Sequence, residues 1–407
     1  MKVSMQISNR VSSISEALSI YINQIVYDLS RRGKDIITLS LGEAFFDIPL
    51  FDFHKLDVNK GYHYSDSQGI PQLRQKISEY YQKYYRASVD PDRELLISAG
   101  SKPLIYFAMQ ATVNPGEEVL IHEPAWLSYQ EQLRLLDAKP AFIPFDCPVS
   151  DFEKYYNDST RLIIINNPNN PAGRVYSRED LSLLYQQCRK RGIYVLVDEA
   201  YSDFAINNEF VSMAEIVPDK DGVIIVNSLS KNMGVSGWRV GYIITNESLI
   251  PHLLKLNQHL ITCAPTILLQ YLTYYFEKII NITLPQVEEV VKKRAEIAKM
   301  LDELAFKYLE GASTFYFFVN IEDFPGSSTD FAMHLLLEEG IAVVPGSAYG
   351  QSTERFVRVS IGAESLERIW QALVSMRDLI DSKNFDQTKI NLMLSEIGME
   401  PFEDVNG

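Results

Sequence analysis

The order of apolar and polar positions predicts alternating strands and helices through the middle of the chain. Short β-branched runs recur there, and helix-like stretches separate several of them. This alternation is typical of a mostly parallel sheet covered by helices on both faces. The predicted strands are Leu95–Ser98, Val119–His122, Ala141–Pro144, Arg161–Asn166, Tyr194–Asp198, Val223–Asn227 and Val240–Thr245.

The same pattern predicts helix ends and two lobes. In "SREDLSLLYQQCRKRG", Ser177 and Asp180 form a capping box and Gly192 closes the helix. After about Pro285 a long charged helix leads into a short α+β segment, which predicts a second lobe. We expect a large domain at 46–285, and a small discontinuous α+β domain made of 1–45 and 286–407. The acidic tail after about residue 384 is expected to be partly disordered.

Composition narrows the class of protein. The 407 residues are 46% hydrophobic and 22% charged, which is ordinary for a globular enzyme, and the net charge is -15. The acidic charge argues against nucleic acid and anionic membrane as partners, and no apolar stretch is long enough to span a bilayer. Three scattered cysteines and no signal-peptide pattern predict a cytoplasmic protein without a metal site.

Candidate chemistry gathers where predicted strands end, because open α/β sheets bind ligands beyond the carboxyl ends of their strands. Asn166 and Asp198 end two apolar runs, and the loop "SLSKNMGVSGWR" follows a third. A partly desolvated lysine near a cation has a lowered pKa and forms Schiff bases with aldehydes. Hydroxyls and a forked guanidinium suit a phosphate. Lys231 beside Arg239 therefore suggests an aldehyde that carries a phosphate.

The longer string S-L-S-K-x-x-G-x-x-G-W-R-x-G resembles the lysine motif of the class I/II (fold type I) aminotransferases, which use pyridoxal phosphate (PLP). The resemblance implies the fold type I architecture, with a mostly parallel seven-stranded sheet in the large domain. It implies ping-pong transfer of an amino group between an L-amino acid and a 2-keto acid. Lys231 is then the catalytic residue, and Ser228, Ser230 and Arg239 bind the cofactor phosphate.

Two further motifs match the family's contacts to the cofactor ring. "DEAY" implies that Asp198 pairs with the ring nitrogen and that Tyr201 binds the phenolic oxygen. "NPNNPAG" implies that Asn170 donates to that oxygen and contacts the substrate. Here Ala172 stands where the family usually has Thr or Ser.

Other motifs match the remaining cofactor contacts. "AGSKP" implies that Gly100, Ser101 and Lys102 bind the phosphate, largely through backbone amides at a helix N-terminus. "EPAW" implies that Trp126 stacks on the ring. "YSDSQGIPQLR" implies a homodimer in which Tyr64 reaches the phosphate of the neighbouring subunit.

The substrate contacts implied by the resemblance lie far apart in the sequence. Arg358 in "RFVRVSIG" matches the arginine that grips the substrate α-carboxylate, and Gly42 matches the glycine of the substrate loop. The chain has Ala44 and Phe45 where the family usually has Pro and Asp. Specificity therefore cannot be carried over from the family.

Three alternatives stand beside a transaminase. A PLP-dependent lyase of the same fold, such as a C–S lyase or an enzyme similar to aminocyclopropane-carboxylate synthase, shares the first steps. A sensor domain of a transcription regulator would follow a DNA-binding domain, and the motifs here begin too early for one. A nicotinamide dehydrogenase would need G-x-G-x-x-G after an early strand, and no glycine loop here has that spacing.

Overall fold

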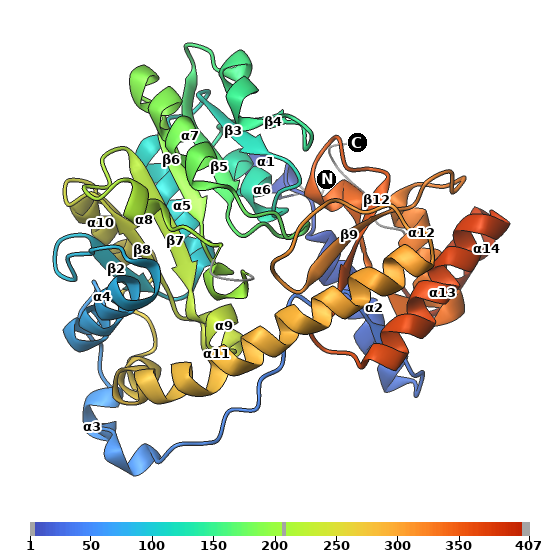
Figure 1. Ribbon diagram of the computed structural model, residues 1–407, viewed down its shortest axis with the longest axis horizontal. Helices are drawn as coiled ribbons and strands as arrows, with labels where there is room; N and C mark the ends of the chain where they lie inside the picture. The colour runs from blue at the N-terminus through green and yellow to red at the C-terminus, as the bar shows by residue number, and fades with distance from the viewer. Residues whose placement is uncertain (1–4, 206–208, 401–407) are drawn as a thin grey trace.

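The computed structural model describes residues 5–205 and 209–400, and its centre is a seven-stranded sheet (Figure 1). The strand order is β2-β8-β7-β6-β5-β3-β4, in which β8 is antiparallel to both neighbours and the other pairs are parallel. The predicted strands are confirmed to within a few residues at their ends. They are β2 (Leu95–Ser98), β3 (Glu118–His122), β4 (Lys139–Ile143), β5 (Thr160–Asn166), β6 (Tyr194–Asp198), β7 (Val223–Ser228) and β8 (Gly241–Thr245).

Helices cover both faces of this sheet because its central strands are apolar on both sides. One face packs on α5 (Ser101–Thr112), α6 (Ser128–Leu135) and α10 (Ile250–Leu260). The other face packs on α4 (Pro71–Tyr85), α7 (Arg178–Arg191) and α8 (Met213–Ile216). Ser177 caps α7 as predicted, accepting from the amide of Asp180 at 3.0 Å, and Gly192 ends it at φ 67°.

A second, smaller group of strands and helices lies beside the large sheet (Figure 1). An antiparallel sheet has the order β11-β12-β9, and β1 pairs in parallel with β10. These strands are β1 (Ile37–Thr38), β9 (Tyr316–Asn320), β10 (Ile341–Ala342), β11 (Val344–Pro345) and β12 (Phe356–Ser360). The helices around them are α2 (Leu18–Arg31), α12 (Ser328–His334) and α13 (Leu366–Ser382).

One long helix, α11 (Thr266–Glu303), contributes to both apolar cores. Its first half, including Tyr271 and Phe276, packs in the core under the large sheet. Its second half, including Val287 and Ile297, packs in the core of the smaller lobe. Pro285 lies inside the helix where the packing changes over, so the sequence expectation of a helix beginning near Pro285 recognised only the second half. Within the described residues, no helix, α11 included, combines the length and apolar character needed to cross a bilayer.

The C-terminal segment differs from the partly disordered tail expected after about residue 384. Residues Gln387–Glu396 form α14, capped by the side chain of Asp386. Ile390 and Leu394 are buried in one apolar cluster with residues of α2 and with Met333 and Leu337 at the end of α12 and just after it. The local sequence is polar enough to suggest disorder, and the apolar partners that order it lie elsewhere in the chain.

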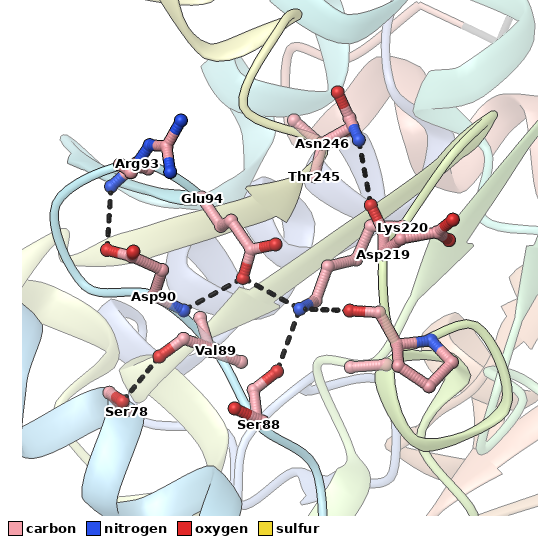
Figure 2. A network of polar contacts seen from close by, with 12 residues as sticks. Ser78, Ser88, Val89, Asp90, Arg93, Glu94, Asp219, Lys220, Thr245 and Asn246 are labelled. Carbon is pink, nitrogen blue, oxygen red and sulfur yellow. Dashed lines mark hydrogen bonds and ion pairs between the residues drawn. The ribbon is translucent and has the colours of Figure 1, made fainter.

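A buried lysine joins the loops at the amino ends of β2 and β7 (Figure 2). Lys220 is 1% exposed, and its Nζ donates to the carboxylate of Glu94 and to the carbonyls of Ser88 and Pro218, each at 2.7 Å. This ammonium group therefore satisfies acceptors from the segment before β2 and from the loop before β7. Without this ammonium group, the half-buried carboxylate of Glu94 would keep only the amide of Asp90 as a donor, and the loss of its cation would be destabilising.

Replacing Lys220 tests how much its three contacts contribute to the stability of the fold. Lys220→Met should lower the free energy of unfolding by about 3 kcal/mol, because it removes the cation paired with the half-buried Glu94 and the donor to two carbonyls. Urea unfolding followed by circular dichroism measures the change. Lys154→Met removes an exposed ion pair with Asp151 and should have little effect. Equal unfolding midpoints for the two variants would contradict the assigned role.

Candidate active site

The carboxyl ends of three neighbouring strands bring polar side chains together at one edge of the large sheet. Asn166 at the end of β5 pairs in register with Asp198 at the end of β6, and Ser228 ends β7. The short helix α9 (Leu229–Asn232) follows β7 and carries Lys231. Ser228 caps α9 by accepting from the amide of Ser230 at 3.1 Å. The lysine is therefore fixed to the edge of the sheet by a helix that begins where the strand stops.

These groups line a cavity of about 320 Å³. The structure brings all but two of the predicted site residues to this cavity. Those that line it are Gly42, Ser101, Lys102, Trp126, Asn170, Asp198, Tyr201, Ser228, Ser230, Lys231, Arg239 and Arg358.

Gly100 and Tyr64 are the two predicted residues that lie outside the cavity lining. Gly100 precedes α5 at φ 95°, and a Cβ there would lie 2.7 Å from Nη2 of Arg239. Its missing side chain lets the guanidinium pack against the turn. Tyr64 is 85% exposed and lines a separate surface cavity of about 460 Å³.

The amino group of Lys231 lies in a desolvated position between charged neighbours. Its Nζ donates to the carbonyl of Gly42. Burial lowers the pKa of Lys231 to about 8; the carboxylate of Glu43 opposes this shift, and the cations Arg358 and Arg239 add to it. Burial disfavours the charged form of an amine. At neutral to mildly alkaline pH this lysine therefore has a much larger neutral, nucleophilic fraction than an exposed lysine has.

Asp198 is a buried carboxylate at the floor of the cavity. Its Oδ2 accepts from the hydroxyl of Tyr129 at 2.7 Å, and its Oδ1 accepts from the amide of Ala200 at 3.1 Å. Burial raises the pKa of Asp198 to about 6, and these two hydrogen bonds oppose the shift. A carboxylate held this way is suited to pair with a buried cationic N–H.

Asn170 and Tyr201 form a pair of hydrogen-bond donors on the wall of the cavity. Nδ2 of Asn170 lies 3.2 Å from the hydroxyl of Tyr201, and that hydroxyl lies 2.9 Å from the hydroxyl of Tyr316. Burial raises the pKa of the Tyr201 phenol well above its ordinary value, so it stays protonated. The turn that carries Asn170 is held by Asn166, whose Oδ1 accepts from the amide of Asn170 at 2.5 Å.

Arg358 comes from β12 of the smaller lobe and is buried where the two lobes meet. Its Nη2 donates to the carbonyl of Ser40 at 2.7 Å, and its Nη1 donates to Oδ1 of Asn170 at 3.3 Å. The guanidinium carbon lies 4.4 Å from the ring centroid of Tyr316. Two of its five N–H donors are thus used by the protein, and the guanidinium keeps the planar edge that binds a carboxylate at two points.

The opposite end of the cavity is cationic and open. Lys102 and Arg239 are exposed, and Arg239 donates to the carbonyl of Ser236 at 2.7 Å. Nζ of Lys102 lies 5.0 Å from the ring centroid of Trp126. Two cations, three serine hydroxyls and the N-terminus of α5 make this end suited to a dianionic phosphate.

Several cavity residues were missed by sequence reasoning. Asn166 had a signal, because it ends an apolar strand. Tyr316 had none, and neither had Tyr129, which bonds Asp198 without lining the cavity, because the chain has 23 tyrosines and most of them pack in cores. The cavity residues not predicted are Ser19, Glu43, Asn166, Ala200, Ser236, Gly237 and Tyr316.

The family is shown by comparison with known sequences. Residues 52–374 match the model for aminotransferase class I and II, and the chain belongs to this family. It is 32% identical to the (5-formylfuran-3-yl)methyl phosphate transaminase of Methanocaldococcus jannaschii, over 87% of this chain and 94% of the relative. It is 30% identical to the aspartate aminotransferase of Thermotoga maritima, over 93% of this chain and all of the relative.

Solved structures agree with this assignment. The Thermotoga maritima aspartate aminotransferase superposes with a TM-score of 0.81 at 28% identity, covering 92% of this chain and 100% of that one. A Methanococcus jannaschii protein described as similar in its active site to kynurenine aminotransferases gives a TM-score of 0.81 at 31% identity, with the same coverage. The fold is therefore that of a fold type I enzyme. The protein is a PLP-dependent aminotransferase.

The cavity fits PLP group by group. The cationic open end suits the phosphate, and the Asp198 carboxylate suits a protonated ring nitrogen. The amide of Asn170, which donates to the hydroxyl of Tyr201, and that hydroxyl lie side by side on one wall, and both can donate to a phenolic oxygen. The amine with the lowered pKa is the group that an aldehyde needs.

The lowered pKa predicts a selective reactivity of the cofactor-free protein. At pH 8, about half of the Lys231 amines should be neutral, whereas an ordinary exposed lysine is well under ~1% neutral. Pulse acetylation across a pH series, followed by peptide mass mapping, should give a midpoint near pH 8 for Lys231. Glu43→Gln should move that midpoint lower, because the carboxylate opposes the shift. A midpoint equal to that of exposed Lys154 would contradict the burial argument.

Proposed function

We propose that the 320 Å³ cavity is the active site of this aminotransferase and that Lys231 is its catalytic residue. The observation that carries the proposal is the lysine amine, whose pKa burial lowers to about 8, in one cavity with Asp198 and Arg358. An amine of this kind accepts a proton readily and releases it again near neutral pH. General-base chemistry needs both properties.

The residues around the cavity have separate proposed roles in holding PLP. Asp198 pairs with the ring nitrogen, Asn170 and Tyr201 bind the phenolic oxygen, and Trp126 packs on the ring. PLP, when bound, supplies an electron-withdrawing ring that stabilises negative charge at the substrate Cα. The proposed phosphate ligands are Gly100, Ser101, Lys102, Ser228, Ser230 and Arg239.

Lys231 moves the proton on which transamination depends. With PLP held by these residues, the amine of Lys231 would take the proton from the substrate Cα, and the resulting ammonium would return it on the far side of the transferred nitrogen. The carbonyl of Gly42, which accepts from Nζ, orients the amine toward the middle of the cavity. Glu43 keeps part of the lysine population charged, so the group is available both as a base and as an acid.

Arg358 binds the α-carboxylate in both halves of the reaction. An amino acid and a 2-keto acid share this group, so one guanidinium serves the donor and the acceptor in turn, as ping-pong transfer requires. Asn170 and the backbone at Ser40 hold the guanidinium in place, while Gly42 forms the adjacent wall. Burial of the guanidinium and of the bound α-carboxylate excludes water and strengthens the attraction between them.

The proposed assembly is a homodimer in which Tyr64 completes the partner's phosphate site. Tyr64 and Tyr274 are 85% and 54% exposed, and both line the surface cavity between α3 (Val58–Gly61) and the start of α11. Exposed aromatic residues on one face are typical of protein interfaces. The open phosphate end at Lys102 and Arg239 is the kind of site that a neighbouring chain covers.

The proposed location is the cytoplasm. All three cysteines are unpaired, which fits a reducing compartment.

Removing the amine tests the role of Lys231. Lys231→Ala should lower the rate of transamination by at least ~10²–10⁴-fold, because it removes the general base. Single-turnover kinetics with the cofactor-loaded protein measures the loss. Wild-type turnover should require a keto-acid acceptor; ammonia and pyruvate formed without an acceptor would indicate a lyase. A variant that transaminates at nearly the wild-type rate would refute the role of Lys231.

Mixing two variants tests the assembly. The wild-type particle should have twice the chain mass of 46.5 kDa. Tyr64→Ala should weaken PLP binding by ~10-fold or more, which is the loss expected for a hydrogen bond to a charged group. Co-expression with Lys231→Ala chains should then restore activity, since each mixed dimer has one site with both native residues. Tyr62→Ala is the matched control and should bind PLP normally. If the mixture is no more active than the two variants measured separately and added together, the two chains do not share a site.

A further inference from the structure

Tyr349 places a buried hydroxyl beside the arginine that we assign to the substrate carboxylate. The residue ends the 3-10 helix η7 (Gly346–Tyr349) and is 1% exposed. Among the described residues, its hydroxyl has no hydrogen-bond partner, and the same holds for Nε of Arg358. A buried polar group without a partner is destabilising, and such groups in native proteins often mark functional sites.

The two unpaired groups belong to side chains in contact. The guanidinium carbon of Arg358 lies 5.5 Å from the ring centroid of Tyr349 and 4.4 Å from that of Tyr316. Ser40 and Asn170 occupy two of the other donors of Arg358. Burial raises the pKa of the Tyr349 phenol, and the charge of Arg358 opposes this shift. The phenol is therefore a neutral hydroxyl beside a cation that acts on its pKa as a donor, although no hydrogen bond of ordinary geometry joins the two side chains.

The backbone around Tyr349 is fixed to the segment that carries Trp126. The amide of Ala125 donates to the carbonyl of Tyr349 at 2.8 Å, and the buried carboxylate of Glu123 accepts from the amide of Ser352 at 3.0 Å. A Cβ on Gly350 would lie 2.4 Å from Oε1 of Glu123, so the loop approaches as closely as glycine permits. Tyr349 is thus held against the large lobe, although the segment that carries it belongs to the smaller lobe.

We propose that Tyr349 is a positioning residue for Arg358: in the substrate-bound enzyme its hydroxyl accepts a hydrogen bond from the guanidinium and turns the planar edge toward the α-carboxylate. The proposal rests on the role of Arg358 given under the proposed function. Glu123 anchors the Tyr349 loop to the Trp126 segment. The site for the substrate carboxylate is therefore held at a fixed position relative to the cofactor site. Tyr349 does not line the cavity, so it acts through Arg358 and not on the substrate.

Tyr349→Phe tests the proposal, because it removes only the hydroxyl. The KM values for the amino acid and for the keto acid should both rise by about 10-fold, since the hydrogen bond to a charged group is lost. The kcat value and the affinity for PLP should change less than about 2-fold. The melting temperature should stay the same or rise, because an unpaired buried hydroxyl is gone. Unchanged KM values would overturn the proposal, as would a loss of PLP affinity.

A double-variant cycle separates this proposal from the role of Arg358. Arg358→Lys alone should raise both KM values, and adding Tyr349→Phe to it should raise them little further. If the two effects multiply in full, Tyr349 acts independently of Arg358 and the proposal fails, while the role of Arg358 stands. If Arg358→Lys leaves KM unchanged, the carboxylate assignment fails and this proposal falls with it. Tyr156→Phe, which removes a buried hydroxyl near Gln187, is the matched control and should leave KM unchanged.

Discussion

The site depends on keeping one lysine amine out of water at the carboxyl edge of a parallel sheet. Lys231 lies on a short helix that starts where β7 stops, so the sheet fixes its position and the surrounding lobes remove its solvent. Burial lowers its pKa to about 8, and the charges of Glu43, Arg358 and Arg239 adjust the result. Desolvation therefore makes an ordinary side chain into a nucleophile and base. The other groups that line the cavity matter because they determine which molecules can bind beside that amine.

The second requirement is that two lobes meet at the same cavity. The large sheet supplies the lysine and the carboxylate of Asp198, whereas β12 of the smaller lobe supplies Arg358. The helix α11 extends through both apolar cores, so the lobes share one rigid element. Asn170 contacts both Tyr201 and Arg358, which links the proposed cofactor side of the cavity to the proposed substrate side. Packing in the two cores thus sets the distance between the reacting groups.

Sequence patterns predicted what is local and missed what depends on distant partners. Apolar runs located the seven strands, and motif spacing located residues such as Asp198 and Lys231, because each follows a strand end directly. Tyr316 and Tyr349 were not predicted, since only strand pairing and packing within the smaller lobe bring them to Arg358. Helix α14 was missed for the same reason: its order comes from an apolar cluster that it shares with α2 and α12, which lie elsewhere in the chain. The continuity of α11 through Pro285 likewise follows from packing on both cores.

The most direct test of the account locates the attachment point of the cofactor. The PLP-loaded protein is reduced with borohydride, which makes the cofactor–lysine linkage permanent, and is then digested and mapped by mass spectrometry. The account predicts that the added mass lies on the peptide containing Lys231. Lys102 lines the same cavity and is the natural competitor. A label on Lys102, or a native protein that binds no PLP, would contradict the central claim.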